Sequence, residues 1–181
     1  MSSSAARAAV DVQAYLDDQK KLLAAQTSDP TVVSAVRNFA LALKGVAGDR
    51  LIGMRDAYAK PTNDGKPAIE RPKGGGSTYD RMHEQYYAGF VSTMKPQGLA
   101  DICLIDEVGR VLYSATRGED YAVNLNEGKW AHAALSKMTK SLSEEPEPQV
   151  MISDIVAYPQ TGPSLFISGR RVEPQPDQCP T

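Results

Sequence analysis

Long apolar runs are missing from this sequence. No stretch approaches the roughly 20 apolar residues that a membrane-spanning helix needs, and the start, MSSSAARAAVDV, lacks the apolar core of a signal peptide. Charge of one sign is missing too, because 20 basic residues stand against 22 acidic ones and the net charge is −2. This balance offers no basic surface to nucleic acid or anionic lipid, so we expect no nucleic-acid partner.

Cysteine and histidine are scarce, with two residues of each. Cys103 lies in an expected strand, where we predict it to be buried, and Cys179 lies in a proline-rich tail. We interpret them as free thiols; the alternative, a disulfide between them, has no support from their spacing. His83 and His132 stand far apart, and HEQYY is not the HExxH pattern of zinc sites. We therefore predict no catalytic residue, no metal site, no cofactor and no enzymatic activity.

The first half of the chain has the patterns of helices. An Ala-rich amphipathic pattern predicts one over residues 5–27, of the kind that forms a helix-packing seam. Asp29 and Pro30 predict the cap and the first position of a second helix. A short helix fits residues 51–58, and Ser77 predicts the cap of another.

Strand patterns dominate the second half. Strand-forming residues on both sides of the turn at residues 106–109 predict a hairpin, in which Gly109 permits a positive φ. A helix is predicted over residues 130–142, followed by strands over 150–158 and 164–172. Helices followed by hairpins indicate an α+β fold with an antiparallel sheet, here of four strands.

These patterns divide the chain into three parts. Residues 1–99 form an N-terminal helical segment, residues 100–174 an α+β subdomain, and residues 175–181 a proline-rich tail. The length of 181 residues and the hydrophobic content of 41% suit one domain with a helical extension.

Four short segments follow one another in a recognisable order. They are Asp29–Phe39 (DPTVVSAVRNF), Tyr79–Tyr86 (YDRMHEQY), the hairpin Cys103–Ser114 (CLIDEVGRVLYS) and Asp120–Leu125 (DYAVNL). Together they resemble Cache domains, the PAS-like extracytoplasmic sensor domains of bacterial chemoreceptors, histidine kinases and nucleotide cyclases. The resemblance covers nearly the whole chain. It implies a PAS-like antiparallel sheet behind long N-terminal helices, and a sensor domain instead of an enzyme.

The chain departs from the family pattern in two places. The family's sheet has five strands, of which the fifth is central, whereas four are predicted here. The membrane helix that should precede residue 5 is also missing. We therefore expect a fragment without its last strand, whose sheet exposes ladder edges.

A ligand pocket is expected between the sheet and the segment that covers it, because the resemblance places PAS-like pockets there. Aromatic side chains wall such pockets, and carboxylates or arginines hold polar ligand ends. In a regular strand Asp154 and Tyr158 would share a face. The predicted ligand-binding residues are Tyr113, Tyr121, Trp130, Asp154 and Tyr158, with Arg170 or Arg171 as counter-charge for an amino acid or small carboxylate. The alternative is that these aromatic residues form ordinary core and rim.

The resemblance implies a role in signal transduction. We expect a sensor domain that binds a small molecule on the periplasmic face of the bacterial inner membrane, as part of a methyl-accepting chemotaxis protein or a related receptor. Residues 5–27 would form a homodimer and pass a conformational change, through a membrane helix outside this chain, to a cytoplasmic signalling domain. The alternative is a soluble PAS-like regulatory domain of a cytoplasmic signalling enzyme.

Overall fold

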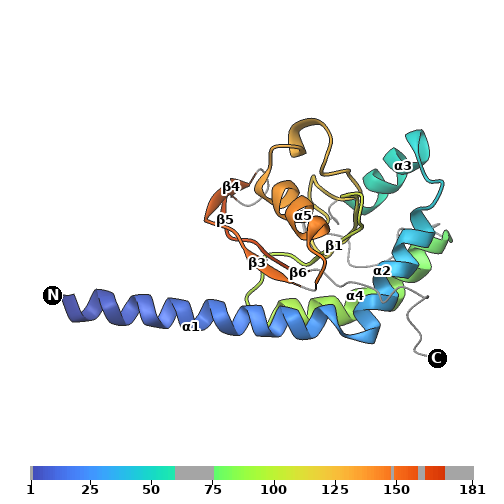
Figure 1. Cartoon of the computed structure of the whole chain (residues 1–181). Helices are drawn as coiled ribbons and strands as arrows, with labels where there is room; N and C mark the ends of the chain where they lie inside the picture. Colours follow the sequence, from blue (N-terminus) through green and yellow to red (C-terminus); the bar gives the residue numbers. More distant parts are fainter. Residues whose placement is uncertain (1, 60–75, 148, 159–161, 170–181) are drawn as a thin grey trace, which may run out of the picture.

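Helices come first in this fold and short strands last (Figure 1). The computed structural model describes residues 2–59, 76–147, 149–158 and 162–169. The first helices are α1 Ser2–Thr27, α2 Pro30–Leu43, α3 Gly48–Ala59 and α4 Thr78–Met94. The next elements are β1 Cys103–Ile105, β2 Val111–Ser114, the 3₁₀ helix η1 Gly128–Trp130 and α5 Ala134–Glu144. The last are β3 Val150–Ile152, β4 Val156–Tyr158, β5 Gly162–Ser164 and β6 Ile167–Gly169. The protein is therefore α+β, as predicted.

Two predicted helix starts are confirmed by their caps. The Asp29 carboxylate accepts a hydrogen bond from the Thr31 N–H at 2.6 Å, and Pro30 is the first residue of α2. Ser77 and Asp80 form a reciprocal capping box: the Asp80 N–H donates to Ser77 Oγ at 3.1 Å, and the Ser77 N–H donates to Asp80 Oδ2 at 2.9 Å. These bonds satisfy N–H groups that have no partner within a helix.

The helix predicted over residues 130–142 is wrong at its start. Trp130 ends the 3₁₀ turn η1, and Ala133 is extended, with ψ of 150°, so α5 begins only at Ala134. The indole of Trp130 is buried in a core beside Val111 of β2. This tertiary burial outweighs the helical spacing that Trp130 has with Met138.

The described strands form three two-stranded antiparallel sheets instead of one four-stranded sheet. β1 pairs with β2, β3 with β6, and β4 with β5. The last two pairs are one long hairpin interrupted at Ser153. Its N–H donates to the Phe166 carbonyl at 2.9 Å, and its Oγ accepts from the Phe166 N–H at 2.9 Å. Because a hydroxyl takes the place of a ladder carbonyl, the predicted strand over 150–158 breaks in two, and the strand predicted from residue 164 breaks with it.

The edge of β2 that faces away from β1 is partly covered by the segment that follows it. The Val111 N–H donates to the Val123 carbonyl at 2.8 Å, and the Leu125 N–H donates to the Gly109 carbonyl at 2.8 Å. Gly109 has a φ of +81°, as its place in the turn predicted. Part of the ladder edge that we expected to be exposed is therefore paired.

Two hydrophobic cores meet at β2, whose four residues are all buried. The first joins α2, α3 and α4 to β1 and β2, and Phe39 lies at its centre with ring contacts of 5.1 Å to both Tyr79 and Tyr113. The second consists of Val111, Leu125, Trp130, Leu135 and Tyr158. The first core contains side chains from the predicted helical segment, residues 1–99, and from the predicted α+β subdomain, residues 100–174. These two segments therefore pack as one unit.

The helix α1 packs on the C-terminal hairpin with its second half only. It contacts α2, β3 and β6, whereas Val10 and Tyr15 stay 66% and 54% exposed. Figure 1 shows its first half running past the rest of the described fold. At the contact, a Cβ atom on Gly169 would lie 2.7 Å from Thr27 Cγ2 and 3.3 Å from Leu23 Cγ. The backbone of β6 therefore lies directly against α1.

Candidate functional site

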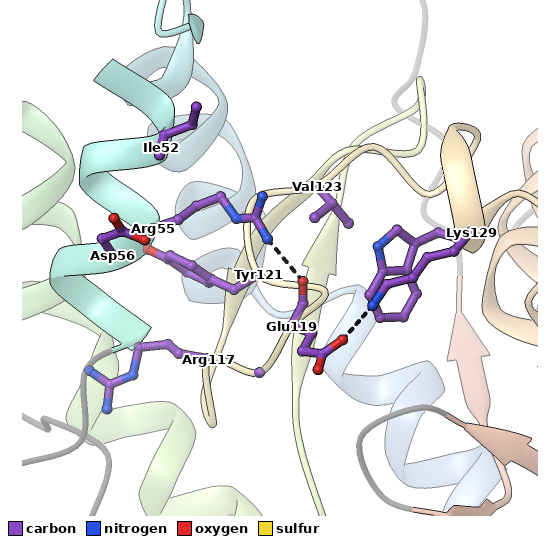
Figure 2. Close-up of a pocket in the computed structure, with 10 residues that line it drawn as sticks. Ile52, Arg55, Asp56, Arg117, Glu119, Tyr121, Val123 and Lys129 are labelled. Carbon is purple, nitrogen blue, oxygen red and sulfur yellow. Dashed lines mark hydrogen bonds and ion pairs between the residues drawn. The ribbon is translucent and has the colours of Figure 1, made fainter. Parts of the chain in front are cut away.

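A pocket of about 710 Å³ opens between α3 and the segment of residues 115–130, which we call the connector. Its walls are Ile52, Arg55 and Asp56 of α3, and Arg117, Gly118, Glu119, Tyr121, Val123, Lys129 and Trp130 of the connector. Figure 2 shows Lys129 on the side of the pocket opposite α3. Five of these residues are charged and four are apolar or aromatic, so the pocket is more polar than most small-molecule sites, whose walls are mainly apolar.

The start of the connector is fixed by Asp101, which precedes β1. Its carboxylate accepts hydrogen bonds from Ser114 Oγ at 2.7 Å, from Thr116 Oγ1 at 2.7 Å and from the Thr116 N–H at 3.0 Å. Ser114 Oγ in turn accepts from the Arg117 N–H at 2.8 Å. Arg117 has a φ of 55°, in the left-handed region that non-glycine residues seldom adopt. The Asp101 network therefore holds a strained turn that positions Arg117.

Charged groups join the two walls of the pocket (Figure 2). Arg55 Nη2 donates to the Glu119 carbonyl at 3.1 Å, and the Lys129 ammonium forms an ion pair with the Glu119 carboxylate. The hydrogen bond from Lys129 lowers the pKa of Glu119. Lys129 Nζ also lies 4.9 Å from the centre of the Trp130 ring. Exposed ion pairs stabilise a fold by at most about 1 kcal/mol, so a ligand can replace these contacts at little loss.

Several buried polar groups, some of which feel the charge of Arg117, have no hydrogen-bond partner in the described part of the chain. They include the hydroxyls of Tyr113 and Tyr121 and the Nε2 atom of His83. Burial, and then the Arg117 charge, lowers the pKa of His83 to about 4, so its imidazole is neutral at pH 7. Burial raises the pKa of both tyrosines. Their hydroxyls therefore keep their protons and can act as donors.

The structure brings two of the five predicted ligand-binding residues to this pocket. Tyr121 and Trp130 line it. Tyr113 is fully buried in the first core, and Tyr158 is buried in the second. Asp154 is exposed and lines a different, smaller pocket of about 370 Å³.

The prediction that Asp154 and Tyr158 share one face of a regular strand is wrong. The interruption at Ser153 ends the alternation of side chains before Asp154 is reached. Asp154 is then exposed, while the Tyr158 hydroxyl donates to Asp120 Oδ2 at 2.6 Å. That bond links the connector to the C-terminal hairpin.

The sequence patterns did not indicate the charged groups of the pocket, which are Arg55, Asp56, Arg117, Glu119 and Lys129. One signal was available for Arg117, a cation in a short loop directly after a buried strand. The α3 wall had no comparable signal, because the contact between α3 and the connector joins residues about sixty positions apart. The expected counter-charges Arg170 and Arg171 lie outside the described residues.

The thiol of Cys103 is free, as predicted, but the residue is half-buried and not buried. It lies on β1, whose residues alternate between partial and full burial. Its Sγ atom contacts the Asp101 carboxylate at 3.6 Å. Burial of the sulfur, followed by the Asp101 charge, raises the pKa of this thiol, so it is not a reactive thiolate at pH 7. Cys179 and the tail lie outside the described residues.

Comparison with known proteins yields no relative: no family model, curated protein or solved structure matches the chain. Among the residues that the structure describes, no three potential metal ligands come together. Over the same residues, no helix has both the length and the hydropathy of a membrane span. The function of this chain must therefore be inferred from its pocket.

Proposed function

We propose that this chain is a Cache-type sensor domain of a bacterial transmembrane receptor, on the periplasmic face of the inner membrane, and that it binds a small molecule. The observation that carries the proposal is the pocket of about 710 Å³ with Tyr121 and Trp130 in its wall. The order of elements supports it as well, since helices, hairpin, connector, helix and hairpin follow one another as in the resemblance. In this proposal the short sheets belong to a PAS-like fold that a further strand would complete.

A short series of contacts leads from the pocket to α1. A ligand that displaces the bond between Arg55 and the Glu119 carbonyl would shift the connector relative to α3. The connector is bonded to the hairpin through Asp120 and Tyr158, and the hairpin lies against α1 at Gly169. Ligand binding at one end would therefore favour a different placement of α1 at the other.

The first half of α1 is where we propose that a second copy binds. Val12 and Tyr15 are three positions apart, so they lie on the same side of the helix, and both are more than half exposed. Covering such a face with a partner helix stabilises it. Sedimentation equilibrium of the purified chain tests this proposal. A dimer is expected, and Tyr15→Lys should shift it toward monomer, whereas a wild-type chain that stays monomeric at high concentration contradicts the proposal.

A thermal-shift screen against amino acids, carboxylates, polyamines and purines tests the sensor function. A ligand at one hundred times its Kd should add about 2.7 kcal/mol to the free energy of unfolding, an easily measured shift. Ile52→Arg should abolish the response, because Ile52 lines the pocket from an exposed position, where a larger side chain fills the pocket without disturbing the core.

Asp154→Ala is the matched control, since Asp154 is also exposed but lines the other pocket. It should respond to the ligand as the wild type does. A folded protein that no compound stabilises, or a response lost in Asp154→Ala and kept in Ile52→Arg, would contradict the proposed site.

A further inference from the structure

The segment of residues 117–122, within the connector, is strained at both of its ends. Arg117 and Ala122 each have a φ of 55°, and they are the two non-glycine residues with a positive φ in the described part of the chain. Neither has the short polar side chain with which asparagine or aspartate stabilises this backbone region. Strain of this kind persists only where the surroundings enforce it, and it gathers in segments that change conformation.

The same segment contains most of the buried polar side-chain atoms that lack a hydrogen-bond partner among the described residues. Arg117 is 3% exposed, and none of its three guanidinium nitrogens is bonded. Asp120 is 2% exposed, and its Oδ1 atom is not bonded. The Tyr121 hydroxyl is the third unpaired group. Leaving a buried polar group unpaired is unfavourable, above all for a charged one, so the side chains disfavour this conformation as the backbone does.

Arg117 and Asp120 have opposite charges but lie on opposite sides of the connector. Arg117 extends toward α4, where its Cζ atom is 5.6 Å from the centre of the Tyr87 ring, and Figure 2 shows it pointing away from Glu119. Asp120 extends toward the second core, where its Oδ2 atom accepts from the hydroxyl of Tyr158 at 2.6 Å. The strained backbone between them therefore keeps two buried opposite charges apart.

Asp120 has the acceptor that Arg117 lacks. Asp80, the other buried carboxylate of the described chain, is fully used: its Oδ1 accepts from the Tyr58 hydroxyl at 2.6 Å, and its Oδ2 accepts from the Ser77 N–H and hydroxyl. Within the described ranges, Asp120 Oδ1 is the one buried carboxylate oxygen without a donor. A guanidinium binds both oxygens of a carboxylate through two parallel bonds. A pair of this kind would displace the Tyr158 hydroxyl from Oδ2.

We propose that residues 117–122 form a two-state switch in which Arg117 and Tyr158 compete for the carboxylate of Asp120. In the state described above, Tyr158 binds Asp120, and this bond joins the connector to the C-terminal hairpin. In the second state Arg117 binds Asp120, and the bond to the hairpin is broken. The use of this switch to pass a signal toward α1 rests on the proposed sensor function, whereas the two states exist without a ligand.

A double-mutant cycle on the full, ligand-free chain tests the competition. Tyr158→Phe removes one of the two donors for Asp120 and keeps a ring in the second core. In the wild-type background Arg117 takes over, so we expect the equilibrium constant of unfolding to rise by less than about 5-fold. In the Arg117→Met background Asp120 stays buried without either donor, so the same change should raise that constant by about 30-fold or more. Denaturant titration measures the four constants.

Two further variants are the controls. Arg50→Met removes an exposed arginine of α3, so Tyr158→Phe should have the same effect in this background as in the wild type. Asp120→Asn removes the charge for which the two donors compete. With asparagine at that position, the effect of Tyr158→Phe should no longer depend on whether Arg117 is present.

Relaxation-dispersion NMR detects the second state directly and does not require Arg117→Met to fold. The backbone amides of residues 117–123 should exchange between two environments in the wild type. Tyr158→Phe should raise the population of the second state. Ala122→Gly should lower it, because glycine adopts a φ of 55° without strain and thus favours the described state.

Two results would overturn the inference. One is an equal effect of Tyr158→Phe on unfolding in the wild-type and Arg117→Met backgrounds. The other is a single environment for the amides of residues 117–123 in the wild type and in Tyr158→Phe. Neither result bears on the sensor function, because no ligand is present, and a ligand screen without a response would contradict the sensor function without bearing on the switch.

Discussion

Replacing Asp101 with alanine should lower the free energy of unfolding by about 3 kcal/mol. The Asp101 carboxylate accepts from the hydroxyls of Ser114 and Thr116 and from the Thr116 N–H. A hydrogen bond contributes about 1 kcal/mol net in a setting that water still reaches, and Asp101 is half-buried, so these three bonds together contribute about 3 kcal/mol. Because Ser114 holds the Arg117 N–H, the strained turn should also relax. Denaturant titration measures the loss.

Asp106→Ala is the matched control at the opposite end of the same hairpin. Asp106 is also half-buried and also accepts several bonds, from the N–H groups of Val108 and Arg110 and from the Arg110 guanidinium. Its bonds stay within one turn, so we expect a loss of about 1 kcal/mol. Equal losses in the two variants would show that Asp101 has no special role in positioning the connector.

The stability of the protein should fall by about 3 kcal/mol as the pH drops from 6.5 to 4. The pKa of His83 is 6.5 in the unfolded chain and about 4 in the folded one, chiefly because the imidazole is buried. Above pH 6.5 neither state binds the proton. Between the two values the unfolded state binds it and the folded state does not, so unfolding becomes easier. Below pH 4 both states are protonated, and this contribution changes no further.

Denaturation midpoints at pH 7.5, 5.5 and 4.5 measure this dependence. His83→Phe should remove most of it, because phenylalanine keeps a ring against Tyr87 and cannot bind a proton. His132→Gln should retain it, since His132, the second of the two histidines, is exposed. Burial favours a raised pKa at Asp80, but its hydrogen bonds with Tyr58 and Ser77 hold the pKa below its usual value. Its effect therefore appears at lower pH than the range tested. Equal pH dependence in wild type and His83→Phe would contradict the assignment.

Features set by neighbouring residues could be predicted from the sequence. Asp29 and Ser77 begin their helices because a side chain within three positions caps the backbone. Gly109 marks its turn because few other residues adopt a φ of +81°. The α+β class follows from the same local patterns in order.

Features set by distant contacts could not be predicted. The break at Ser153 depends on Phe166 across the hairpin, and the position of Trp130 depends on the second core. The pocket needs α3 beside the connector, which no pattern in either segment specifies. Tyr121 and Trp130 were predicted because the resemblance to Cache domains places a pocket between the sheet and the segment that covers it. Arg117 was missed, because an arginine in a short loop after a buried strand marks a position of interest without showing whether its side chain will be buried or paired.

Because Gly169 lies directly against α1, a movement of the C-terminal hairpin would change the tilt of this helix. Its 26 residues span about 39 Å, and the backbone of β6 meets it near its last turn, at Leu23 and Thr27. Gly169 has no side chain that could change its rotamer, so a small rotation of the hairpin would tilt the whole helix. A tilt of about 5° about this contact would move the N-terminal end of α1 by about 3 Å.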